Sequence, residues 1–430
     1  MIPASLGVGK PVVAEAPPKS RLPRALILAG AGIILLSFVR IVADADDLTS
    51  VGSFGAAIRL GVPILLAGLG GLYAERCGVV NIGLEGMMIL GTWFGAYGAI
   101  QFGAWQGVLL GVVGGMLGGL IHAIATVTFG VDHVVSGVAM NILGAGVARY
   151  LSVIAWVDKG TGGGATQSPK ITTGIDEVDL PFFAGGSLFG WQTPDVFGRL
   201  ASWHWFVVSD IAGLVRALTG AISLLSLLAI ALVPLSIFFL WRTPLGLRLR
   251  SAGESPQAAE SLGVDVYRMK YLGVIVSGGL AGLGGSFLVL EGAGIYREAQ
   301  TGGRGFIGLA SLIFGNWRPG GVAMGAGLFG FADALRLRNE DAVHALLLFV
   351  ALGAALAAAY LLYRRRVRAG GFLIAVAVAF GYWFTTSDTI PRQFLSFTPH
   401  ITTLLVLAFA TQRLRPPAAD GLRYRKGQSD

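Results

Sequence analysis

Residues 244–270 read PLGLRLRSAGESPQAAESLGVDVYRMK, a polar stretch of 27 residues between two long apolar segments. This contrast decides the fold class, because the segments at 218–241 and 271–292 are long and apolar enough to cross a membrane, whereas the stretch between them is not. The stretch is basic and rich in alanine, and we expect it to be helical. It is typical of a surface on which a soluble partner docks. The alternative is an ordinary solvated loop that follows the positive-inside rule.

The composition of the whole chain agrees with a membrane protein. Of its 430 residues, 54% are hydrophobic and 13% are charged, against roughly 25% charged in soluble domains. Apolar runs of about 20 residues recur along the chain, and as helices they suffice to span a hydrocarbon core of about 30 Å. The sequence lacks the ten-residue alternating segments of a membrane barrel. It therefore predicts an all-α polytopic membrane protein.

Glycine supplies 65 residues, about twice its usual share. Gly111, Gly115 and Gly119 repeat at four-residue spacing on one face of an expected helix. Small residues let helix backbones approach closely in lipid, so this stripe predicts a tight contact with another helix.

About twelve transmembrane helices are expected. Their approximate ranges are 25–43, 55–74, 79–101, 105–128, 134–155, 218–241, 271–292, 306–317, 320–337, 342–363, 370–386 and 395–412. The span at 306–317 is too short to cross alone unless it is extended or paired with buried backbone.

The distribution of basic residues predicts the orientation. Lysine and arginine gather before the first span, in 244–270, after the tenth span and in 413–430, and such clusters favour the cytoplasmic side. We therefore expect a cytoplasmic N-terminal tail at 1–24, a transmembrane domain at 25–412 and a cytoplasmic C-terminal tail at 413–430. The acidic loop 156–206 then lies outside. The first apolar run is expected to be a retained helix rather than a cleaved signal.

The residue types present exclude several functions. The net charge of +8 is dispersed among short loops, so the chain lacks the gathered basic face that binds nucleic acid. The one cysteine, Cys77, and five scattered histidines give no metal-ligand spacing. The segment GVGK at 7–10 is followed by Pro11 and lacks the remainder of a phosphate-binding loop. We expect no catalytic residue, metal, cofactor or ATPase site, so any ATP is bound by partner subunits.

An internal repeat predicts two halves of inverted topology. The sequence IGLEGMMILGTW at 82–93 resembles IGLASLIFGNW at 307–317, which is one residue shorter. With the orientation above, the first runs outward and the second inward, and such halves commonly enclose a path at mid-membrane. Chance similarity is the alternative, because glycine and leucine are abundant.

Polar groups at membrane depth mark candidate functional residues, because charges inside spans are costly. Glu85 is the foremost candidate. Gly83 and Gly86 beside it permit a helix break that frees backbone groups for a ligand. Glu85 either contacts a solute or is the structural partner of a basic residue such as Arg59 or Arg76.

Neutral side chains extend this candidate path. Asn81 precedes Glu85 on the same segment, and Met87 and Met88 follow it. The methionines either line a pore or pack in the interior. Asn141 and Asn316 either bind a polar solute or hydrogen-bond a neighbouring helix.

Three segments together resemble a known family. They read CGVVNIGLEGMMILG at 77–91, GLRLRSAGESPQAAESLGV at 246–264, and GLAGLGGSFLVLEG at 279–292 followed by GGRGFIGLASLIFGNWRPGG at 302–321. They are similar to the permease subunits of bacterial ABC importers in the branched-chain amino acid, ribose and nucleoside group. The first and third look most like the nucleoside (purine or guanosine) branch, where Asn-Ile-Gly-Leu-Glu-Gly replaces the Gly-Gly-Ile-Asp-Leu-Ser of sugar permeases.

This resemblance implies a multi-subunit importer in the bacterial inner membrane, with both termini cytoplasmic. It would comprise two permease subunits, as a homo- or heterodimer, two ABC ATPase subunits and an external solute-binding protein. The segment from Asn81 to Met88 would line the path for a small-molecule solute. The residues expected to seat an ATPase subunit are Gly253, Glu254, Pro256, Ala258, Ala259 and Gly263. The region 342–386 departs from the family pattern and is expected to be an inserted helical hairpin.

The favoured function is ATP-driven import of a small polar solute, with a nucleoside foremost. A simple-sugar or branched-chain amino acid permease is the alternative within the same group. A stand-alone secondary transporter or channel would need intramembrane ionisable pairs and would have no use for 244–270. A membrane enzyme would need a cluster of His, Asp or Cys. The identity of the solute stays open, because the external protein selects it.

Overall fold

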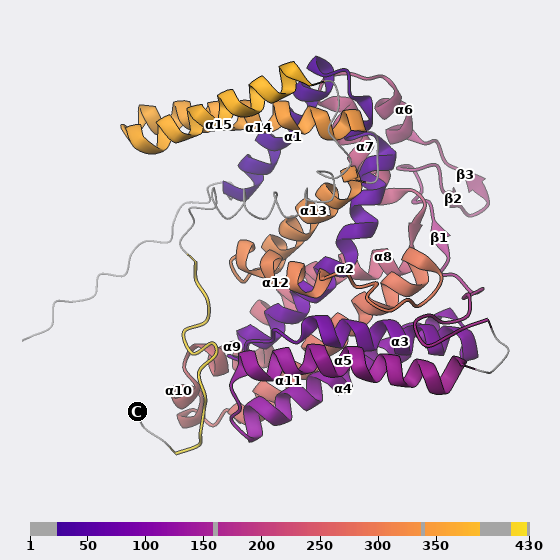
Figure 1. The fold of residues 1–430 in the computed structure, drawn as a ribbon, viewed down its shortest axis with the longest axis vertical. Coiled ribbons are helices and arrows are strands. Elements are labelled where there is room, and N and C mark those ends of the chain that lie inside the picture. The colour runs from indigo at the N-terminus through magenta and orange to yellow at the C-terminus, as the bar shows by residue number, and fades with distance from the viewer. Residues whose placement is uncertain (1–23, 158–161, 337–339, 388–413, 428–430) are drawn as a thin grey trace, which may run out of the picture.

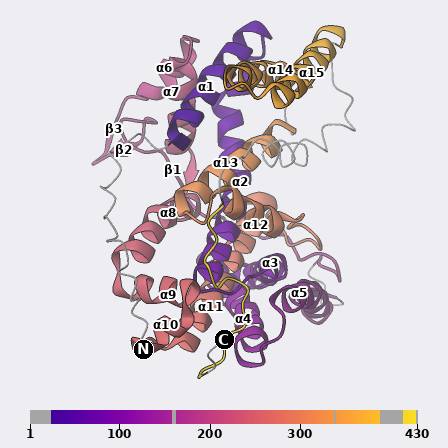
Figure 2. The same cartoon turned by 90° about the vertical axis from the view of Figure 1, so that its left-hand side faces the viewer.

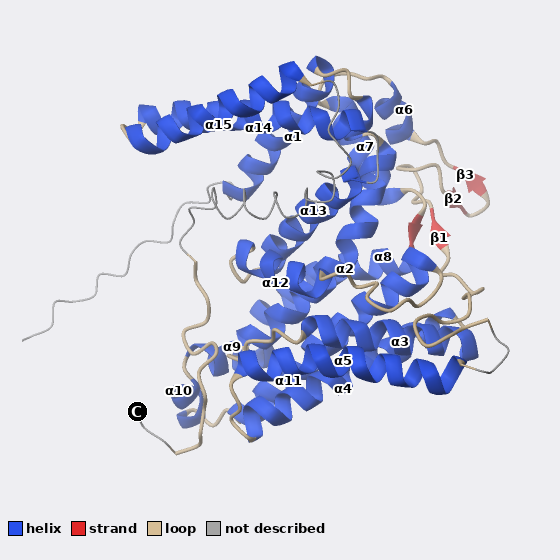
Figure 3. Ribbon diagram, viewed as in Figure 1, coloured by secondary structure: helices blue, strands red, loops and turns tan. Residues whose placement is uncertain are grey.

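The computed structural model describes residues 24–157, 162–336, 340–387 and 414–427 (Figure 1). These residues are mostly helical, and the strands are short (Figure 3). The α-helices are α1 (Arg24–Val42), α2 (Val51–Arg76), α3 (Leu84–Phe102), α4 (Ala104–Ala123), α5 (His133–Trp156), α6 (Val196–Ser202), α7 (Val208–Thr219), α8 (Leu224–Arg242), α9 (Pro244–Glu254), α10 (Pro256–Ser261), α11 (Val266–Phe287), α12 (Arg304–Phe314), α13 (Pro319–Arg336), α14 (Glu340–Tyr363) and α15 (Val367–Thr386). The predicted all-α class is confirmed.

Smaller elements complete these helices. A 3-10 turn, η1 (Asp46–Thr49), follows α1, and π-helical turns extend α4 as η2 (Ile124–Thr128) and α11 as η3 (Leu288–Ala293). Four two-residue strands form two antiparallel pairs, β1 (Glu177–Val178) with β4 (Ile222–Ser223) and β2 (Ser187–Leu188) with β3 (Trp191–Gln192).

The first eleven predicted spans each coincide with a helix, and the twelfth, 395–412, lies outside the described residues. Three predicted starts differ by five or more residues from the structure, and one of them is that of α11, which begins at Val266 instead of 271. Helix α3 begins at Leu84 instead of 79, because the chain first makes a turn in which Gly78 has a φ of +82°, a conformation that favours glycine. Helix α8 begins at Leu224 instead of 218, because strand β4 precedes it.

Seven helices of the described part are long and apolar enough to cross a membrane, counting η2 and η3 with the helices that they extend. They are Val51–Arg76, Ala104–Thr128, His133–Trp156, Leu224–Arg242, Val266–Ala293, Ala342–Tyr363 and Val367–Thr386. With the shorter helices between them they make a multi-pass membrane protein.

Helix α2 forms the centre of the molecule (Figure 1). It begins at the cap residue Ser50, whose hydroxyl accepts a hydrogen bond of 3.2 Å from the Ser53 backbone N–H. Every residue from 61 to 75 is buried, and the helix packs against α11, α12 and α13. A helix that is apolar and buried on all sides is a core helix, so α2 connects most of the other elements.

The predicted glycine stripe is a helix contact. A methyl group at Gly115 would lie 2.1 Å from the Gly278 carbonyl oxygen, and one at Gly119 would lie 2.6 Å from the Val274 oxygen. At Gly111 the corresponding neighbour is the Ser286 hydroxyl. All three partners lie on α11, so the missing side chains let the backbones of α4 and α11 touch.

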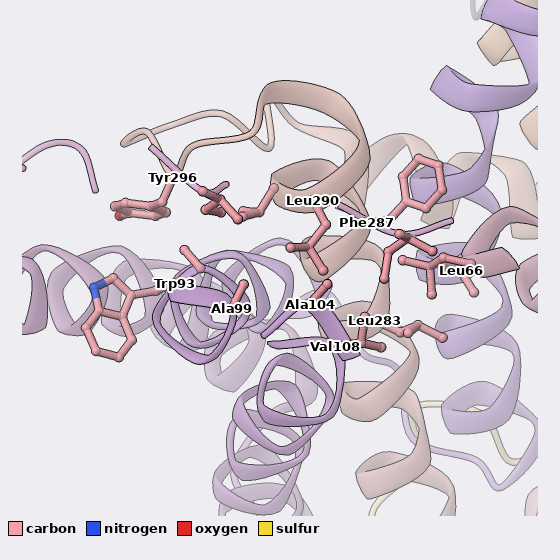
Figure 4. Packing of buried hydrophobic residues seen from close by; sticks show 14 of the residues in the cluster. Leu66, Trp93, Ala99, Ala104, Val108, Leu283, Phe287, Leu290 and Tyr296 are labelled. Atoms are coloured by element: carbon pink, nitrogen blue, oxygen red, sulfur yellow. The ribbon is translucent and has the colours of Figure 1, made fainter. Parts of the chain in front are cut away.

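A hydrophobic cluster joins α2, α3, α4 and α11 (Figure 4). Leu66 of α2 is fully buried with Phe287 of α11 in this cluster. Trp93 of α3 stacks on Tyr97 at 5.2 Å between ring centroids, and its Nε1 donates a 3.0 Å hydrogen bond to the Ser152 hydroxyl of α5. The cluster therefore fixes α5 against α3.

The two repeat copies form unequal helices. The first copy begins α3, which has 19 residues, and the second lies in α12, which has 11. Helix α12 is then about 16 Å long, roughly half of a bilayer core. It ends before Asn316 and Trp317, which both have positive φ. Helix α12 packs against α2, α3 and α13, and the buried face of this short span consists of Gly305, Gly308, Ser311 and Leu312.

Helices α14 and α15 form the hairpin expected at 342–386. They pack against each other and α14 contacts α1, with a core that includes Val39, Leu48, Val343 and Leu347. Figure 1 shows α14 and α15 running side by side at the opposite end of the molecule from α3, α4 and α5, and Figure 2 shows the same separation.

The segment predicted as an external loop, 156–206, carries the small elements β1, β2, β3 and α6 instead of a span. Arg216 of α7 holds this segment by ion pairs to Asp195 at 2.8 Å and Asp179 at 3.5 Å. The side of the membrane on which it lies stays a prediction.

Candidate functional site

The turn between α2 and α3 is fixed by Asn81. This residue is fully buried, and its Nδ2 donates a hydrogen bond of 2.9 Å to the Ser277 hydroxyl of α11. Its Oδ1 accepts a hydrogen bond of 3.0 Å from the Gly83 backbone N–H, directly before α3 begins. Asn81 therefore joins the start of α3 to α11.

Glu85 lies in the first turn of α3 and is 7% exposed. Its carboxylate accepts three hydrogen bonds. The Thr301 hydroxyl (2.6 Å) and the Gly303 backbone N–H (2.9 Å) donate to Oε1, and the Gly305 backbone N–H (2.7 Å) donates to Oε2. Gly303 is the cap residue of α12, so the carboxylate occupies the N-terminus of that helix.

This position explains how a charge is accommodated at membrane depth. Free backbone N–H groups and the helix dipole stabilise an anion at a helix N-terminus. Of the two basic partners considered from the sequence, Arg76 instead donates to the Trp317 carbonyl and pairs with Glu254 at 3.7 Å. Arg59 lines a separate cavity. The structure thus gives Glu85 a structural partner of another kind, the start of α12.

Asn141 of α5 holds the start of α3 from the side opposite to α12. Its Oδ1 accepts a hydrogen bond of 2.8 Å from the Gly86 N–H, and its Nδ2 donates one of 3.1 Å to the Ile82 carbonyl. The close approach requires glycine, because a methyl group at Gly86 would lie 2.2 Å from the Met140 oxygen. Gly83 is the cap residue of α3, so the helix starts after it and continues unbroken through Gly86.

Met87 and Met88 are fully buried. Met87 belongs to a small cluster with Leu84 and Ala281, and Met88 contacts the face of α11 at Gly284. Both therefore pack inside the subunit. Whether they line a path in an assembled transporter stays a prediction.

Asn316 lies apart from these residues. It follows the end of α12, whereas Glu85 contacts the beginning of that helix, about 16 Å away by helix rise. The Asn316 Oδ1 accepts a hydrogen bond of 2.8 Å from the Arg415 backbone N–H. The structure therefore brings together the predicted path residues from Asn81 to Met88 with Asn141, and it places Asn316 elsewhere.

A cavity of about 340 Å³ contains charged residues that the sequence reasoning did not select. It is lined by Arg59 of α2, Glu291 of the turn η3, and Glu177 and Ser223 of the two paired strands. The Ser223 side chain hydrogen-bonds Glu291, while the Oε1 of Glu291 is buried and has no hydrogen-bond partner within the described residues. A charge inside the apolar run 271–292 was the signal that could have identified Glu291.

The polar stretch 244–270 folds into two short helices, α9 and α10, before α11 begins. Proline stands at the start of both, where its missing N–H has no cost, and the Thr243 hydroxyl accepts a hydrogen bond of 3.1 Å from the Gly246 N–H. Gly263 follows α10 with a φ of +79° and ends it. We call residues 244–263 the docking segment.

The residues predicted to seat an ATPase subunit differ in exposure. Glu254, Ala258 and Gly263 lie at the surface, whereas Gly253 is buried. Leu262, which was not among the predicted residues, is 84% exposed beside them. Ala259 is 2% exposed and packs inside the chain with Ala252 and Val266. The segment therefore presents Ala258 outward and Ala259 inward, a distinction that two adjacent alanines do not reveal in sequence.

The structure also shows contacts that sequence reasoning missed. The C-terminal residues 414–427 lie beside the docking segment, and the Ala419 N–H donates a hydrogen bond of 2.9 Å to the Gly253 carbonyl (Figure 1). Glu75, near the end of α2, is 4% exposed and accepts a hydrogen bond from the Trp317 indole. A carboxylate directly after the apolar run 55–74 gave a signal for Glu75, whereas nothing in the tail indicated where the tail binds.

Comparison with known proteins places these features in context. Residues 53–352 match the model of a family described as the permease component of branched-chain amino acid transport systems. No solved structure gives a significant match.

Three relatives show the range of solutes associated with similar chains. The guanosine ABC transporter permease protein NupQ of Bacillus subtilis is 32% identical over 87% of this chain and 96% of its own length. The nucleoside ABC transporter permease protein NupC of Lactococcus lactis is 29% identical over 85% of this chain and 94% of its own length. A putative glucose ABC transporter permease protein, TsgC13 of Haloferax volcanii, is 33% identical over 68% of this chain and 79% of its own length.

Proposed function

Since the chain belongs to the family of permease components of branched-chain amino acid transport systems, we propose that it imports a nucleoside as a permease subunit of an ABC transporter. The observation that carries the solute class is the match to NupQ, which extends over 87% of this chain and 96% of that protein. The match to the nucleoside permease NupC has almost the same extent, whereas the match to the glucose relative is shorter.

The same premise supplies the partners of this chain. ABC ATPase subunits bind the docking segment, a second permease subunit completes the translocation path, and an external solute-binding protein delivers the solute. The docking segment supports the first of these partners, because it exposes small and apolar side chains on two short helices. We place the docking segment and both termini on the cytoplasmic side of a bacterial inner membrane.

The solute contacts a different carboxylate from the one that the sequence favoured. All three hydrogen bonds of Glu85 come from its own chain, so its acceptor capacity is largely occupied. Glu291 retains a buried oxygen without a partner within the described residues, in a cavity that also contains Arg59. A hydroxyl or amino group of a nucleoside would satisfy that oxygen, and burying it unpaired is unfavourable. We place solute contact at this cavity.

Uptake by the reconstituted transporter tests both parts of the proposal. The permease is inserted into proteoliposomes with its ATPase, second permease and binding protein, and uptake of labelled guanosine, uridine, glucose and leucine is measured with and without ATP. ATP-dependent uptake of nucleosides is the expected result. Uptake of glucose or leucine without nucleoside uptake would overturn the proposed solute.

The variant Glu291→Gln tests the location of the contact. It should raise the KM for nucleoside while ATPase binding stays unchanged. Glu298→Gln is the matched control, because the Glu298 side chain is 36% exposed and pairs with Arg149 at the surface. Equal KM values for wild type and Glu291→Gln would show that the solute does not contact this cavity. The proposed identity of the solute would be unaffected.

A further inference from the structure

The C-terminal residues 414–427 bind the docking segment through their backbone. The Ala419 N–H donates a hydrogen bond of 2.9 Å to the Gly253 carbonyl, and the Ala418 N–H donates one of 3.2 Å to the Glu254 carboxylate. Figures 1 and 2 show this segment passing alongside α9 and α10. The tail thus attaches to the junction between these two helices.

Tyr424 adds a side-chain contact to α10. Its hydroxyl donates a hydrogen bond of 2.5 Å to the Glu260 carboxylate, and its ring lies 5.4 Å from that of Tyr267. Tyr424 also packs against the small cluster that contains Ala259 and Val266. Because α10 has only six residues, it is too short to be stable without such packing. The tail is therefore part of what holds α10 in place.

The same tail contacts the ends of two core helices. The Arg415 N–H donates a hydrogen bond of 2.8 Å to Asn316, directly after α12. The Asp420 carboxyl lies against that of Glu75, near the end of α2. Glu75 in turn accepts a hydrogen bond from Trp317, so the tail, α2 and the end of α12 form one network.

We propose that residues 414–427 are a coupling strap, which holds the docking segment to the ends of α2 and α12 and transmits its movement to them. The proposal rests on the proposed function, because it requires an ATPase that moves the docking segment. Tyr424 is then a positioning residue for α10. The contacts are contiguous from α10 to α12, and packed side chains and hydrogen-bond networks of this kind carry energetic coupling between sites.

Three tail variants in the complete transporter test the strap. Tyr424→Ala removes the ring and the hydroxyl, Tyr424→Phe retains the ring, and Ala419→Pro removes the N–H that binds Gly253. Lys426→Ala is the matched control, because its side chain is exposed on the same tail. Size-exclusion chromatography measures folded complex, and parallel assays measure uptake and ATP hydrolysis to give the solute imported per ATP.

Tyr424→Ala and Ala419→Pro should lower solute imported per ATP by about fivefold, the scale expected when an aromatic contact or a backbone hydrogen bond is lost. Tyr424→Phe should give a defect smaller than that of Tyr424→Ala, because it retains the ring packing and loses only the hydrogen bond to Glu260. A defect confined to the amount of complex, with normal solute per ATP, would overturn the strap. So would equal defects in the Phe and Ala variants. If Tyr424→Ala does not fold, the solute imported per ATP by Ala419→Pro tests the strap in its place.

The wild-type transporter separates this proposal from the one on which it rests. ATP-driven uptake by wild type together with unchanged ratios in the variants would overturn the strap alone. No ATP-driven uptake of any solute by wild type would instead overturn the proposed function.

Discussion

The contact of Glu85 with the start of α12 predicts that Glu85→Gln destabilises the folded subunit. The substitution conserves size and removes the charge. One amide oxygen can keep the two donors that now reach Oε1, Thr301 and Gly303. The amide nitrogen would then face the Gly305 N–H, which now donates to Oε2 at 2.7 Å. Two donors would meet in a site that is closed to water.

The structure gives the size of the effect. Loss of a hydrogen bond to a charged acceptor costs about 1.5–3 kcal/mol, and the unsatisfied N–H of Gly305 adds a penalty of similar order. The favourable field of the α12 N-terminus on the carboxylate is lost as well, worth about 0.3–2 kcal/mol. These terms overlap, so we expect a decrease of about 2–4 kcal/mol in the free energy of unfolding.

Unfolding in mixed micelles, titrated with a denaturing detergent, measures this free energy. Glu298→Gln serves as the control, because its ion pair with Arg149 lies at the surface and such pairs contribute about 0–1 kcal/mol. Thr301→Val removes one donor to the same carboxylate, so its effect should be smaller in the Glu85→Gln background than alone.

The result that refutes this reasoning is a Glu85→Gln subunit whose unfolding free energy lies within about 0.5 kcal/mol of wild type, the limit for surface substitutions. Reduced transport in such a stable subunit would return Glu85 to the solute path. Additive effects of Glu85→Gln and Thr301→Val would likewise show that the two residues do not share a contact.

Three further predictions follow from burial, topology and charge. Ala259→Asp should reduce the amount of folded permease, because the Ala259 side chain is 2% exposed and an unpaired buried charge is costly. Ala258→Glu should instead fold normally and weaken copurification of the ATPase. Similar behaviour of the two variants would contradict the assignment of Ala259 to the inside and Ala258 to the surface. In a cysteine-free background, cysteine at Thr172 should react with an impermeant thiol reagent from outside and cysteine at Ser255 should not, and the reverse pattern would invert the topology. Burial raises the pKa of Asp420, which lies near Glu75, Lys270 and Arg76, to about 7. Since the docked tail holds this proton more tightly than the free tail, docking of the tail should weaken as pH rises from about 4 toward about 7. Proteolysis of the tail should therefore be faster at about pH 8 than at about pH 6, and Asp420→Asn should abolish this difference.

The sequence alone determined the fold class and the approximate positions of the long helices. Long apolar runs have few alternatives to a helix in lipid, because every backbone polar group must be hydrogen-bonded within the segment. The stripe of Gly111, Gly115 and Gly119 also revealed a helix contact in advance, although not that its partner is α11. Local chemistry sufficed for these features, since each depends on residues within one or two helical turns.

The sequence also identified Glu85 as important, because a carboxylate in an apolar segment needs a partner. Only the tertiary structure decided which partner. The donors at Thr301, Gly303 and Gly305 lie more than 210 residues away and two of them are backbone groups. No side-chain pattern announces a backbone N–H, so reasoning from sequence turned to arginines as the visible candidates.

The orientation of the docking segment and the site of the tail were likewise decided in three dimensions. Helix α10 is too short to show a periodic apolar face, so Ala258 and Ala259 look alike in sequence until packing buries one of them. The tail binds through Ala418, Ala419 and Tyr424, mostly by backbone groups. Its position depends on surfaces that α2, α10 and α12 create only when they are assembled, which is why the residues of the strap carry no signal of their own.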